Sequence, residues 1–586
     1  AFFVPGPEPR ATMISTPVRL TESAALKLPR LGLFALLFAY ALPGLFGRDP
    51  WRSDDAAGFG VMWSMAQGGW SDWLMPHVVG IPFFEDGPLY FWFGALCIKL
   101  FGGFLPAHEV ARLGTLVALL VATASIWYAV YLLGRRAEAQ PQQFAFGGQP
   151  NARDYGRALA DGALMVCLAM LGLLVRAHET SAELPQFAFG CFALYALARS
   201  LDRPIHGAIA LGLSVAGLTL GHTVGAALVP LVTAAALTLR GREWRVLGWR
   251  WWAVALVVAA LPVAAWLWAV QAEQGGAAYL TNWWAAQGFG WWFLSWSNWA
   301  YYLRNLPWYT WPAWPLAAWA VWAWRAQWRT PHMTLGLVAL GVGVVAMLVA
   351  HEIGQAAMMI ISAPLILLAA FALPTLRRGT ANLIDWFALM MFSVFAVLIW
   401  LGWIAMMTGT PAQIAHNFAK LAPGFVPEFS FVECAIALIA TFAWGWLVWW
   451  RVRARPEVLW RTVVLSAAGV TIVWTLFMTL LLPYVDYLKT YRHVAEQITE
   501  VMPRGQCVRP EYLGPAQRAS LAYFNDLHFG NRCGWLLRYQ NVNQTLPAPD
   551  AARWRKVWEG RRATDRSERF TLYRRVEAPD TGTAAP

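Results

Sequence analysis

Long apolar runs separated by short polar connections fill the chain up to about residue 490, where the composition becomes more polar. Several runs approach the ~20 residues that a helix needs to cross the hydrocarbon of a bilayer. A few are shorter, so we expect about thirteen transmembrane helices. The candidate spans are residues 31–46, 88–105, 109–134, 158–176, 184–198, 205–220, 223–239, 249–270, 312–326, 334–350, 356–374, 386–408, 430–450 and 462–482.

The segments between and around these runs define the predicted domains. An N-terminal segment, residues 1–30, precedes a transmembrane domain that covers residues 31–489. Within that domain, residues 47–87 and 271–311 are predicted to be extracytoplasmic loops, and the second is crowded with Trp and Tyr. Residues 490–586 are predicted to form a small soluble domain.

The pattern in this tail indicates a modest α/β fold. Residues Tyr491–Met502 have helical spacing, and short apolar pieces such as Ser520–Phe524 and Phe570–Tyr573 follow. The tail also holds Cys507 and Cys533, in the one part of the chain where a disulfide would be useful; a bridge there would support a location outside the cytoplasm. The other four cysteines lie in apolar runs and are interpreted as core residues: Cys97, Cys167, Cys191 and Cys434.

Composition agrees with a polytopic α-helical membrane protein. Hydrophobic residues make up 58% of the chain and charged residues 13%, with 37 Trp in 586 residues. A water-soluble domain of this size has no means of keeping so much apolar surface out of solvent.

Basic residues predict which ends of the spans face the cytoplasm. Arg19, Lys27 and Arg30 precede the first span, which lacks a small-residue cleavage site and therefore reads as a retained helix. We expect residues 1–12, before Met13, to be an artificial extension. Further basic clusters predicted to be cytoplasmic are Arg199/Arg203, Arg240/Arg242/Arg245, Arg325/Arg329, Arg377/Arg378 and Arg451/Arg453/Arg455.

One stretch does not fit this topology. Arg135 and Arg136 favour the cytoplasm, whereas the loop that contains Asp54 favours the other side, and the spans counted between residues 88 and 200 do not reconcile the two. The net charge of +12 is explained by the basic loops and by anionic lipid, and requires no nucleic acid.

The first extracytoplasmic loop carries the main functional signal. Asp54 and Asp55 follow Ser53, a residue suited to capping a helix, and apolar residues recur at helical spacing from Phe59 to Trp73. This predicts an amphipathic helix in the plane of the membrane interface. The simplest alternative is that the two acids only complement the helix dipole.

The residues that follow carry a specific resemblance. They read Pro76-His77-Val78-Val79-Gly80 and then Phe84-Glu85-Asp86-Gly87-Pro88-Leu89-Tyr90-Phe91-Trp92. Further on come Ala182-Glu183-Leu184-Pro185, Gly217-Leu218-Thr219-Leu220-Gly221-His222 and Pro307-Trp308-Tyr309. Taken in this order, the segments resemble the polyprenyl-phosphate-dependent glycosyltransferases of the GT-C fold, in particular the branch of the lipid A aminoarabinose transferases, which is related to the protein O-mannosyltransferases.

The resemblance implies an inverting transfer of a sugar from a polyprenyl-phosphate donor to an extracytoplasmic acceptor, such as a lipid A-like glycolipid or another envelope glycan. It implies a location in the bacterial inner membrane, with the active site and tail on the periplasmic side. Asp54 falls on the catalytic acid of the family and is the expected base, and Asp55 falls on the acid after it. Glu183, where the family usually has Asp, is the second catalytic candidate.

The chain departs from the family where the donor phosphate needs positive charge. The lysine of Phe-Glu-Lys-Pro is replaced by Asp86, that of Leu-Thr-Lys-Gly by Leu220, and a later basic site falls near His351. A divalent metal ion on Glu85, Asp86 and a histidine is one substitute, since hard phosphate oxygen suits such a cation. The candidate donor-binding residues are Arg52, His77, Glu85, Asp86, Tyr90, Arg176, His178, His222, Arg304, Trp308 and Tyr309.

Other interpretations remain open. His77 and His222 also fit purely structural hydrogen bonds, and most of the aromatic residues from Trp283 to Trp311 fit an interfacial belt. A protein O-mannosyltransferase-like enzyme is the alternative within the same class. A lipid or sugar transporter would also have many spans, but internal repeats are expected there and the sequence shows no convincing one.

Overall fold

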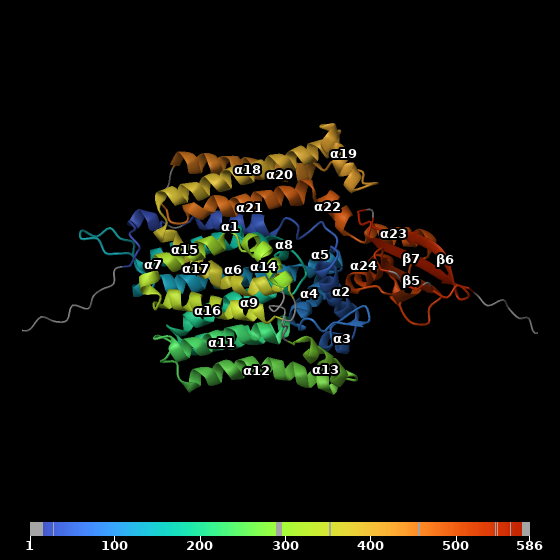
Figure 1. The fold of residues 1–586 in the computed structure, drawn as a ribbon, viewed down its shortest axis with the longest axis horizontal. Helices are drawn as coiled ribbons and strands as arrows, with labels where there is room; N and C mark the ends of the chain where they lie inside the picture. Colours follow the sequence, from blue (N-terminus) through green and yellow to red (C-terminus); the bar gives the residue numbers. More distant parts are fainter. Residues whose placement is uncertain are drawn as a thin grey trace, which may run out of the picture.

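The computed structural model describes residues 16–26, 28–288, 296–350, 353–454, 458–544, 546–547, 549–562 and 564–576. Lys27 and His351 therefore lie outside the described residues. A bundle of long helices forms one body, and the C-terminal domain sits at one end of it, with short helices between the two (Figure 1).

The helices of the first half of the chain are α1 (Arg30–Ala41), α2 (Asp54–Gln67), α3 (Trp70–Leu74), α4 (Leu89–Phe101), α5 (Ala107–Ala111), α6 (Leu113–Gly134), α7 (Ala152–Ala169), α8 (Leu171–Arg176), α9 (Glu183–Ser200), α10 (Pro204–Gly221), α11 (Val224–Arg240), α12 (Trp249–Ala272) and α13 (Gly276–Ala286). A short hairpin, β1 (His77–Val78) and β2 (Ile81–Pro82), lies between α3 and α4.

The second half contributes α14 (Trp296–Tyr309), α15 (Ala313–Ala323), α16 (Pro331–Leu348), α17 (Gln355–Ala372), α18 (Arg378–Thr408), α19 (Ala412–Leu421), α20 (Phe431–Ala454), α21 (Arg461–Leu480) and α22 (Leu482–Lys489). The tail adds α23 (Arg492–Val501) and α24 (Pro515–Asn525). Its strands are β3 (Cys507–Glu511), β4 (His528–Phe529), β5 (Trp535–Asn541), β6 (Trp554–Gly560) and β7 (Glu568–Arg575).

The predicted multi-pass membrane architecture is confirmed. Within the described residues, eight helices are long and apolar enough to cross a bilayer. Their apolar faces are well exposed where no neighbouring helix covers them: only 22% of the α12 and α18 windows and 11% of the α20 window are buried in the protein. Lipid rather than protein is the natural environment of such faces.

The prediction of a span at residues 88–105 is wrong. The helix there, α4, has 13 residues, or about 20 Å at about 1.5 Å per residue, and it differs from the similarly short α1 because it lies outside the bundle (Figure 1). It packs against α2 and α5 beside the C-terminal domain instead of running along the bundle (Figure 1). Its apolar residues are covered by protein on one side, which produces the same local hydrophobicity as a span.

Removing this span resolves the topology of the first third of the chain. Arg135 and Arg136 both form ion pairs with Asp202, the second at 3.2 Å, so the end of α6 lies beside the start of α10. The basic residues after α6 and after α9 therefore share one end of the bundle, opposite the end at which α2 and the C-terminal domain lie (Figure 1). The sequence conflict arose because α4 had been counted as a crossing.

The single interfacial helix predicted from Phe59 to Trp73 is also modified. It is split at Gly68 and Gly69 into α2 and α3. Ser53 makes no side-chain capping bond and instead has a φ of 74°, in the region that favours glycine, which turns the chain sharply into α2. Moreover, α2 is held between α4 and α24 and is largely enclosed by protein.

The C-terminal domain is the predicted small α/β module. Its five strands have the order β4-β3-β5-β7-β6, with β3 parallel to β4 and β5, and β7 antiparallel to β5 and β6. Of the two short apolar pieces noted in the sequence, Ser520–Phe524 lies in helix α24 and Phe570–Tyr573 in strand β7. Cys507 and Cys533 form a disulfide, and Cys97, Cys167 and Cys191 are buried free thiols.

The C-terminal domain rests directly on helix α2. Tyr523 of α24 packs edge-on against Phe59, with ring centroids 5.0 Å apart, and its hydroxyl lies 3.0 Å from His108 Nδ1. A Cβ added at Gly60 would lie 2.5 Å from the Ala519 Cβ, so the two helices meet at van der Waals contact. Arg52 reaches Asp565 at 2.9 Å. The position of α2 is thus set from the soluble side as well as from the bundle.

Candidate active site

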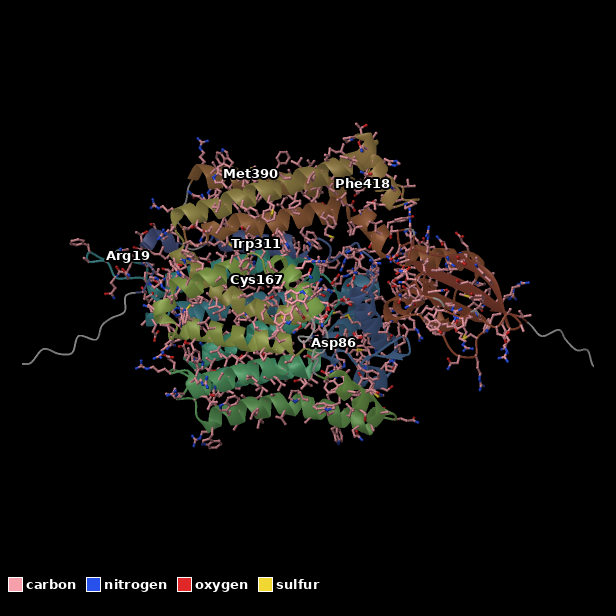
Figure 2. All side chains as sticks on the ribbon, in the orientation of Figure 1. Arg19, Asp86, Cys167, Trp311, Met390 and Phe418 are labelled. Carbon is pink, nitrogen blue, oxygen red and sulfur yellow. A yellow bond between two sulfur atoms is a disulfide. The ribbon has the colours of Figure 1, made fainter. Side chains whose placement is uncertain are left out.

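A cavity of about 690 Å³ opens at the end of the bundle that faces the C-terminal domain. Asp86, one of its lining residues, is labelled in Figure 2 near the junction of the two bodies. The polar lining residues are Asp54, Glu85, Asp86, Arg176, Ser181, Glu183, Gln186, His222, Thr223, Gln287, Tyr301 and Gln355.

The other half of the cavity is apolar. Small and β-branched side chains from α11, α16 and α17 line it, among them Val229, Val342, Ala346, Ala357 and Ile360. The lining residues Leu228, Val232 and Val345 are at least 40% exposed, so this half of the cavity is open and not sealed by neighbouring side chains. One cavity therefore joins a charged pole to an apolar half.

Asp54 lies at the charged pole and is accessible. Its side chain is 57% exposed, and its Oδ2 is 3.0 Å from Arg176 Nη1. The same guanidinium binds Glu183, with Nε 2.8 Å from Oε2, and its Nη1 lies 2.9 Å from Glu179 Oε2. Arg176 thus gathers Asp54 and Glu183, two of the three acids predicted to be catalytic, around one cation, although they stand 129 positions apart in the sequence.

The charge balance at this pole is negative. Three carboxylates surround Arg176, and the amide oxygen of Gln355 accepts a further hydrogen bond from its Nε at 3.0 Å. Burial raises the pKa of Glu179, and although Arg176 opposes this, the nearby acids add to the shift. Glu179 therefore binds a proton more readily than an exposed glutamate does.

Asp55, the other acid of the pair, points away from the cavity and is fully buried. Its Oδ2 lies 3.2 Å from Arg48 Nη2 and 3.4 Å from Arg112 Nη2, and its Oδ1 accepts from Thr180 N at 2.8 Å. Burial alone would raise the pKa of Asp55, but the two arginines and the backbone donors outweigh it and lower the pKa to about 2. A carboxylate so strongly held is a poor general base at neutral pH.

Asp86, from the segment Phe84–Trp92, lies against His222. His222 Nδ1 forms an ion pair with the Asp86 carboxylate, and Gly87 N donates to His222 O at 3.1 Å. Burial alone would lower the pKa of His222, but Asp86 outweighs it and the pKa is raised. The positions at which the family has two lysines, 86 and 220, are thus neighbours in space. Within the described residues, Arg176 and His222 are the cationic side chains that line the cavity.

Four donor-binding candidates lie away from the cavity lining as the structure describes it. Arg52 binds Asp565 of the C-terminal domain, and His77 Nε2 lies 2.9 Å from Asp72 Oδ1 in the β1–β2 region. The Tyr90 hydroxyl is buried 2.7 Å from Thr115 Oγ1. His178 is buried, with its ring nitrogens bonded to backbone carbonyls, and burial lowers its pKa to about 4. These contacts give each residue a structural role.

The donor-binding candidates of the second loop also lie away from the cavity lining. Arg304 is exposed on α14, and Trp308 is 70% exposed. Tyr309 is buried against α8, where a Cβ at Gly172 would lie 2.5 Å from its ring. Its hydroxyl is 3.6 Å from Met359 Sδ. Trp308 fits the predicted interfacial belt, and Tyr309 packs the helix that ends in Arg176.

Sequence reasoning missed the amides of the site. Gln186, Gln287 and Gln355 line the cavity, and Gln355 contacts Arg176 directly. Gln355 follows Gly354 at the first position of α17, and a lone amide at the start of an apolar run is the signal that was available. For the predicted metal site, no group of three or more His, Cys, Asp or Glu with the geometry to hold an ion occurs in the described part of the chain.

The similarity of this chain to known proteins bears on the use of this cavity. No family model matches the chain. An undecaprenyl phosphate-alpha-4-amino-4-deoxy-L-arabinose arabinosyl transferase of Pseudomonas paraeruginosa is 30% identical over 249 residues, 41% of this chain and 40% of that protein. The Pseudomonas aeruginosa protein of the same name is 30% identical over 260 residues, 43% of this chain. The aligned part spans about two fifths of the length of these relatives.

The solved structure of ArnT from Cupriavidus metallidurans in the apo state superposes with a TM-score of 0.62 over 93% of this chain and 98% of that one, at 15% identity. The chain has the ArnT fold. The same protein bound to undecaprenyl phosphate superposes with a TM-score of 0.57 at 14% identity. The resemblance drawn from the motifs is confirmed, and with it the GT-C fold.

Proposed function

We propose that this protein is an inverting membrane glycosyltransferase that moves a sugar from a polyprenyl-phosphate donor to an envelope glycolipid or glycan. The observation that carries the proposal is the single cavity, in which Asp54, Glu183 and two cationic side chains stand at one pole and apolar side chains line the other half. The ArnT fold and the named relatives support it.

Asp54 is the proposed base. The attacking oxygen of the acceptor forms a bond to the anomeric carbon, the bond from that carbon to the donor phosphate breaks, and its electron pair leaves with the polyprenyl phosphate. Asp54 takes the proton from the attacking oxygen, because it is the accessible carboxylate at the cavity mouth. Glu183, held across Arg176, orients the acceptor. A single displacement of this kind inverts the anomeric configuration.

The departing phosphate requires positive charge in a partly dry site. His222 is the proposed main contact, since Asp86 favours its charged form and both side chains line the cavity. Arg176 is a weaker candidate because three carboxylates already surround it. The polyprenyl tail would occupy the apolar half beside Leu228, Val232 and Val345.

The proposed donor sugar is an aminoarabinose-like pentose and the proposed acceptor a lipid A-like glycolipid, following the names of the relatives. The alternative is a protein O-mannosyltransferase-like reaction, which the loss of both motif lysines keeps open. We place the protein in the bacterial inner membrane with the cavity and the C-terminal domain in the periplasm. The basic residues at the opposite end of the bundle support that orientation.

The test is a reconstituted transfer reaction. The purified protein in lipid nanodiscs is incubated with undecaprenyl-phosphate aminoarabinose and lipid A, and in parallel with polyprenyl-phosphate mannose and a Ser/Thr-rich peptide, with products read by mass spectrometry. We expect a sugar-modified lipid A and free polyprenyl phosphate. Product on the peptide alone would favour the alternative enzyme. Failure in both reactions, together with movement of a labelled lipid-linked sugar across proteoliposomes, would reject the transferase proposal in favour of a transporter.

A further inference from the structure

The loop that joins α8 to α9, residues 177–182, is attached to the first two turns of α2 by buried contacts that the proposed reaction does not use. The Thr180 backbone N–H donates to Asp55 Oδ1 at 2.8 Å. The Thr180 hydroxyl donates a hydrogen bond shared between the Asp55 carbonyl oxygen, at 2.7 Å, and the Asp55 Oδ1, at 2.9 Å. Thr180 and Asp55 are both buried, so these bonds form away from solvent.

One turn further along α2, Gly58 completes the attachment. A Cβ built on Gly58 would lie 1.7 Å from the Thr180 carbonyl oxygen, far inside contact distance with a backbone atom. The loop therefore sits in a notch that is open only because residue 58 has no side chain. Asp55 and Gly58 lie about one turn apart, so one face of the helix forms both contacts.

Asp55 is also fastened on its other side. Its Oδ2 accepts from Trp51 N at 2.9 Å and pairs with Arg48 and Arg112. Arg48 in turn donates to His178 O at 2.6 Å, which gives the loop a second attachment. Both carboxylate oxygens are thus occupied by protein donors. This leaves Asp55 with no oxygen for a substrate and makes it a junction between α2 and the loop.

These contacts affect the positions of the residues at the charged pole of the cavity. Asp54 leads α2, Arg176 and Glu183 flank the loop, and the Asp54–Arg176 and Arg176–Glu183 distances of 3.0 and 2.8 Å depend on the relative position of these two segments. Asp54 is exposed and has no buried contact of its own to fix it, so its place follows from the helix that carries it. Reactions of positioned groups are sensitive to such registration, since a displacement of about 1 Å can reduce the rate about a hundredfold.

We propose that Asp55, Thr180 and Gly58 form a positioning element that sets Asp54 against Arg176 and Glu183, and that Asp55 acts through this element and not as a catalytic residue. The proposal rests on the proposed function for its effect on rate. Its structural part, the attachment of the loop to α2, can be tested without any substrate.

Two pairs of variants test it. Gly58→Ala places a methyl group against the Thr180 carbonyl, and the matched control Gly60→Ala places one on the same helix against Ala519 and Val78. Thr180→Val removes the hydroxyl but keeps the branched shape, and Thr180→Ser keeps the hydroxyl. Hydrogen exchange of peptides covering residues 177–182 reports the attachment, and transfer kinetics report its effect.

We expect faster exchange of the loop in Gly58→Ala and Thr180→Val, with kcat reduced between roughly tenfold and a hundredfold and the donor KM little changed. In Thr180→Ser, exchange and kcat should stay near those of the unmodified protein. In Gly60→Ala, where the added methyl group meets Ala519 and Val78 and not the loop, exchange of residues 177–182 should stay near that of the unmodified protein. Unchanged loop exchange in Gly58→Ala, or equally fast loop exchange in Gly60→Ala and Gly58→Ala at equal folded yield, would overturn the proposal. If the unmodified protein transfers no sugar, the proposed function fails, while the exchange data still decide whether the loop is held by these residues.

Discussion

The first turn of α2 presents two consecutive carboxylates to two different environments. Asp54 faces an open cavity, is 57% exposed and pairs with Arg176. Asp55 faces the protein interior, is fully buried and is held by two arginines and two backbone N–H groups. A helix turns by about 100° per residue, so neighbours in sequence necessarily look in different directions.

The comparison shows how identical side chains acquire different chemistry. The buried face surrounds its acid with donors that stabilise the charged form, whereas the open face leaves its acid accessible to substrate. Asp54 is accessible to a substrate, whereas both carboxylate oxygens of Asp55 are occupied by donors from the protein.

The sharpest test of the comparison is Asp54→Asn, which keeps the shape of the side chain but removes its basicity. We expect turnover to fall at least a hundredfold, since base catalysis contributes about 10²–10⁴-fold. Donor binding and thermal stability should be nearly unchanged because the Asp54 side chain is largely exposed. Initial rates in nanodiscs measure this, with Glu496→Gln on the surface of α23 as the control. Retention of more than about a tenth of the turnover would contradict the assignment of Asp54 as base.

The matching change on the buried face is Asp55→Asn. Two buried guanidinium groups would lose their compensating charge, a loss expected to cost about 3–5 kcal/mol. We therefore expect a clear fall in folded yield and in the thermal unfolding midpoint, measured by fluorescence-detected size exclusion after heating. Equal stability of the Asp54→Asn and Asp55→Asn proteins would remove the distinction between the two faces.

A third test concerns the cation opposite Asp54. Asp86→Asn removes the partner that keeps His222 charged against the effect of burial. We expect the dissociation constant of the lipid-phosphate donor to rise about tenfold, equivalent to ~1.4 kcal/mol, with little change in stability. Asp72→Asn is the control, because it breaks a similar acid–histidine pair, with His77, outside the cavity. Equal donor affinity in the two variants would indicate that His222 does not meet the phosphate.

The smallest expected effect is a pH dependence from Asp55. Its pKa is lowered in the folded protein to about 2 from an ordinary 3.8, so its contribution to stability is complete above the ordinary value and is lost as the pH falls through the folded one. Asp55 should therefore contribute no pH dependence to the thermal midpoint between about pH 8 and 5. The midpoint should begin to fall below about pH 4. Thermal scans of the unmodified protein and of Asp55→Asn measure this, and the acid-induced loss should be smaller in the variant.

Much of the fold was predictable because the bilayer imposes a simple rule on sequence. A crossing helix must be apolar over about twenty residues, so most of the bundle appears in the hydrophobic pattern. The error at α4 has the same origin, because a short helix buried beneath a domain is as apolar as a span. Ser520–Phe524 and Phe570–Tyr573 are both short apolar runs, yet the first is helical and the second a strand, because such a run does not distinguish strand from helix.

The candidate site was predicted in part. The motifs selected Asp54, Glu183, Arg176, Asp86 and His222, all of which line the cavity. They also selected Arg52, His77 and His178, whose partners lie elsewhere. Residue type and spacing indicate what a side chain is capable of doing, but only the neighbours brought by other elements decide whether it faces a cavity or a buried partner.

The sequence by itself determined that this chain is a multi-pass helical membrane protein with a soluble tail and an acidic segment at the mouth of the first span. It determined these features because they depend on local composition and periodicity. The tertiary structure alone decided that Asp54 and Asp55 have opposite environments, that Arg176 joins acids 129 positions apart, and that Asp86 meets His222. Such contacts depend on how helices distant in sequence pack together, and no local pattern records that packing.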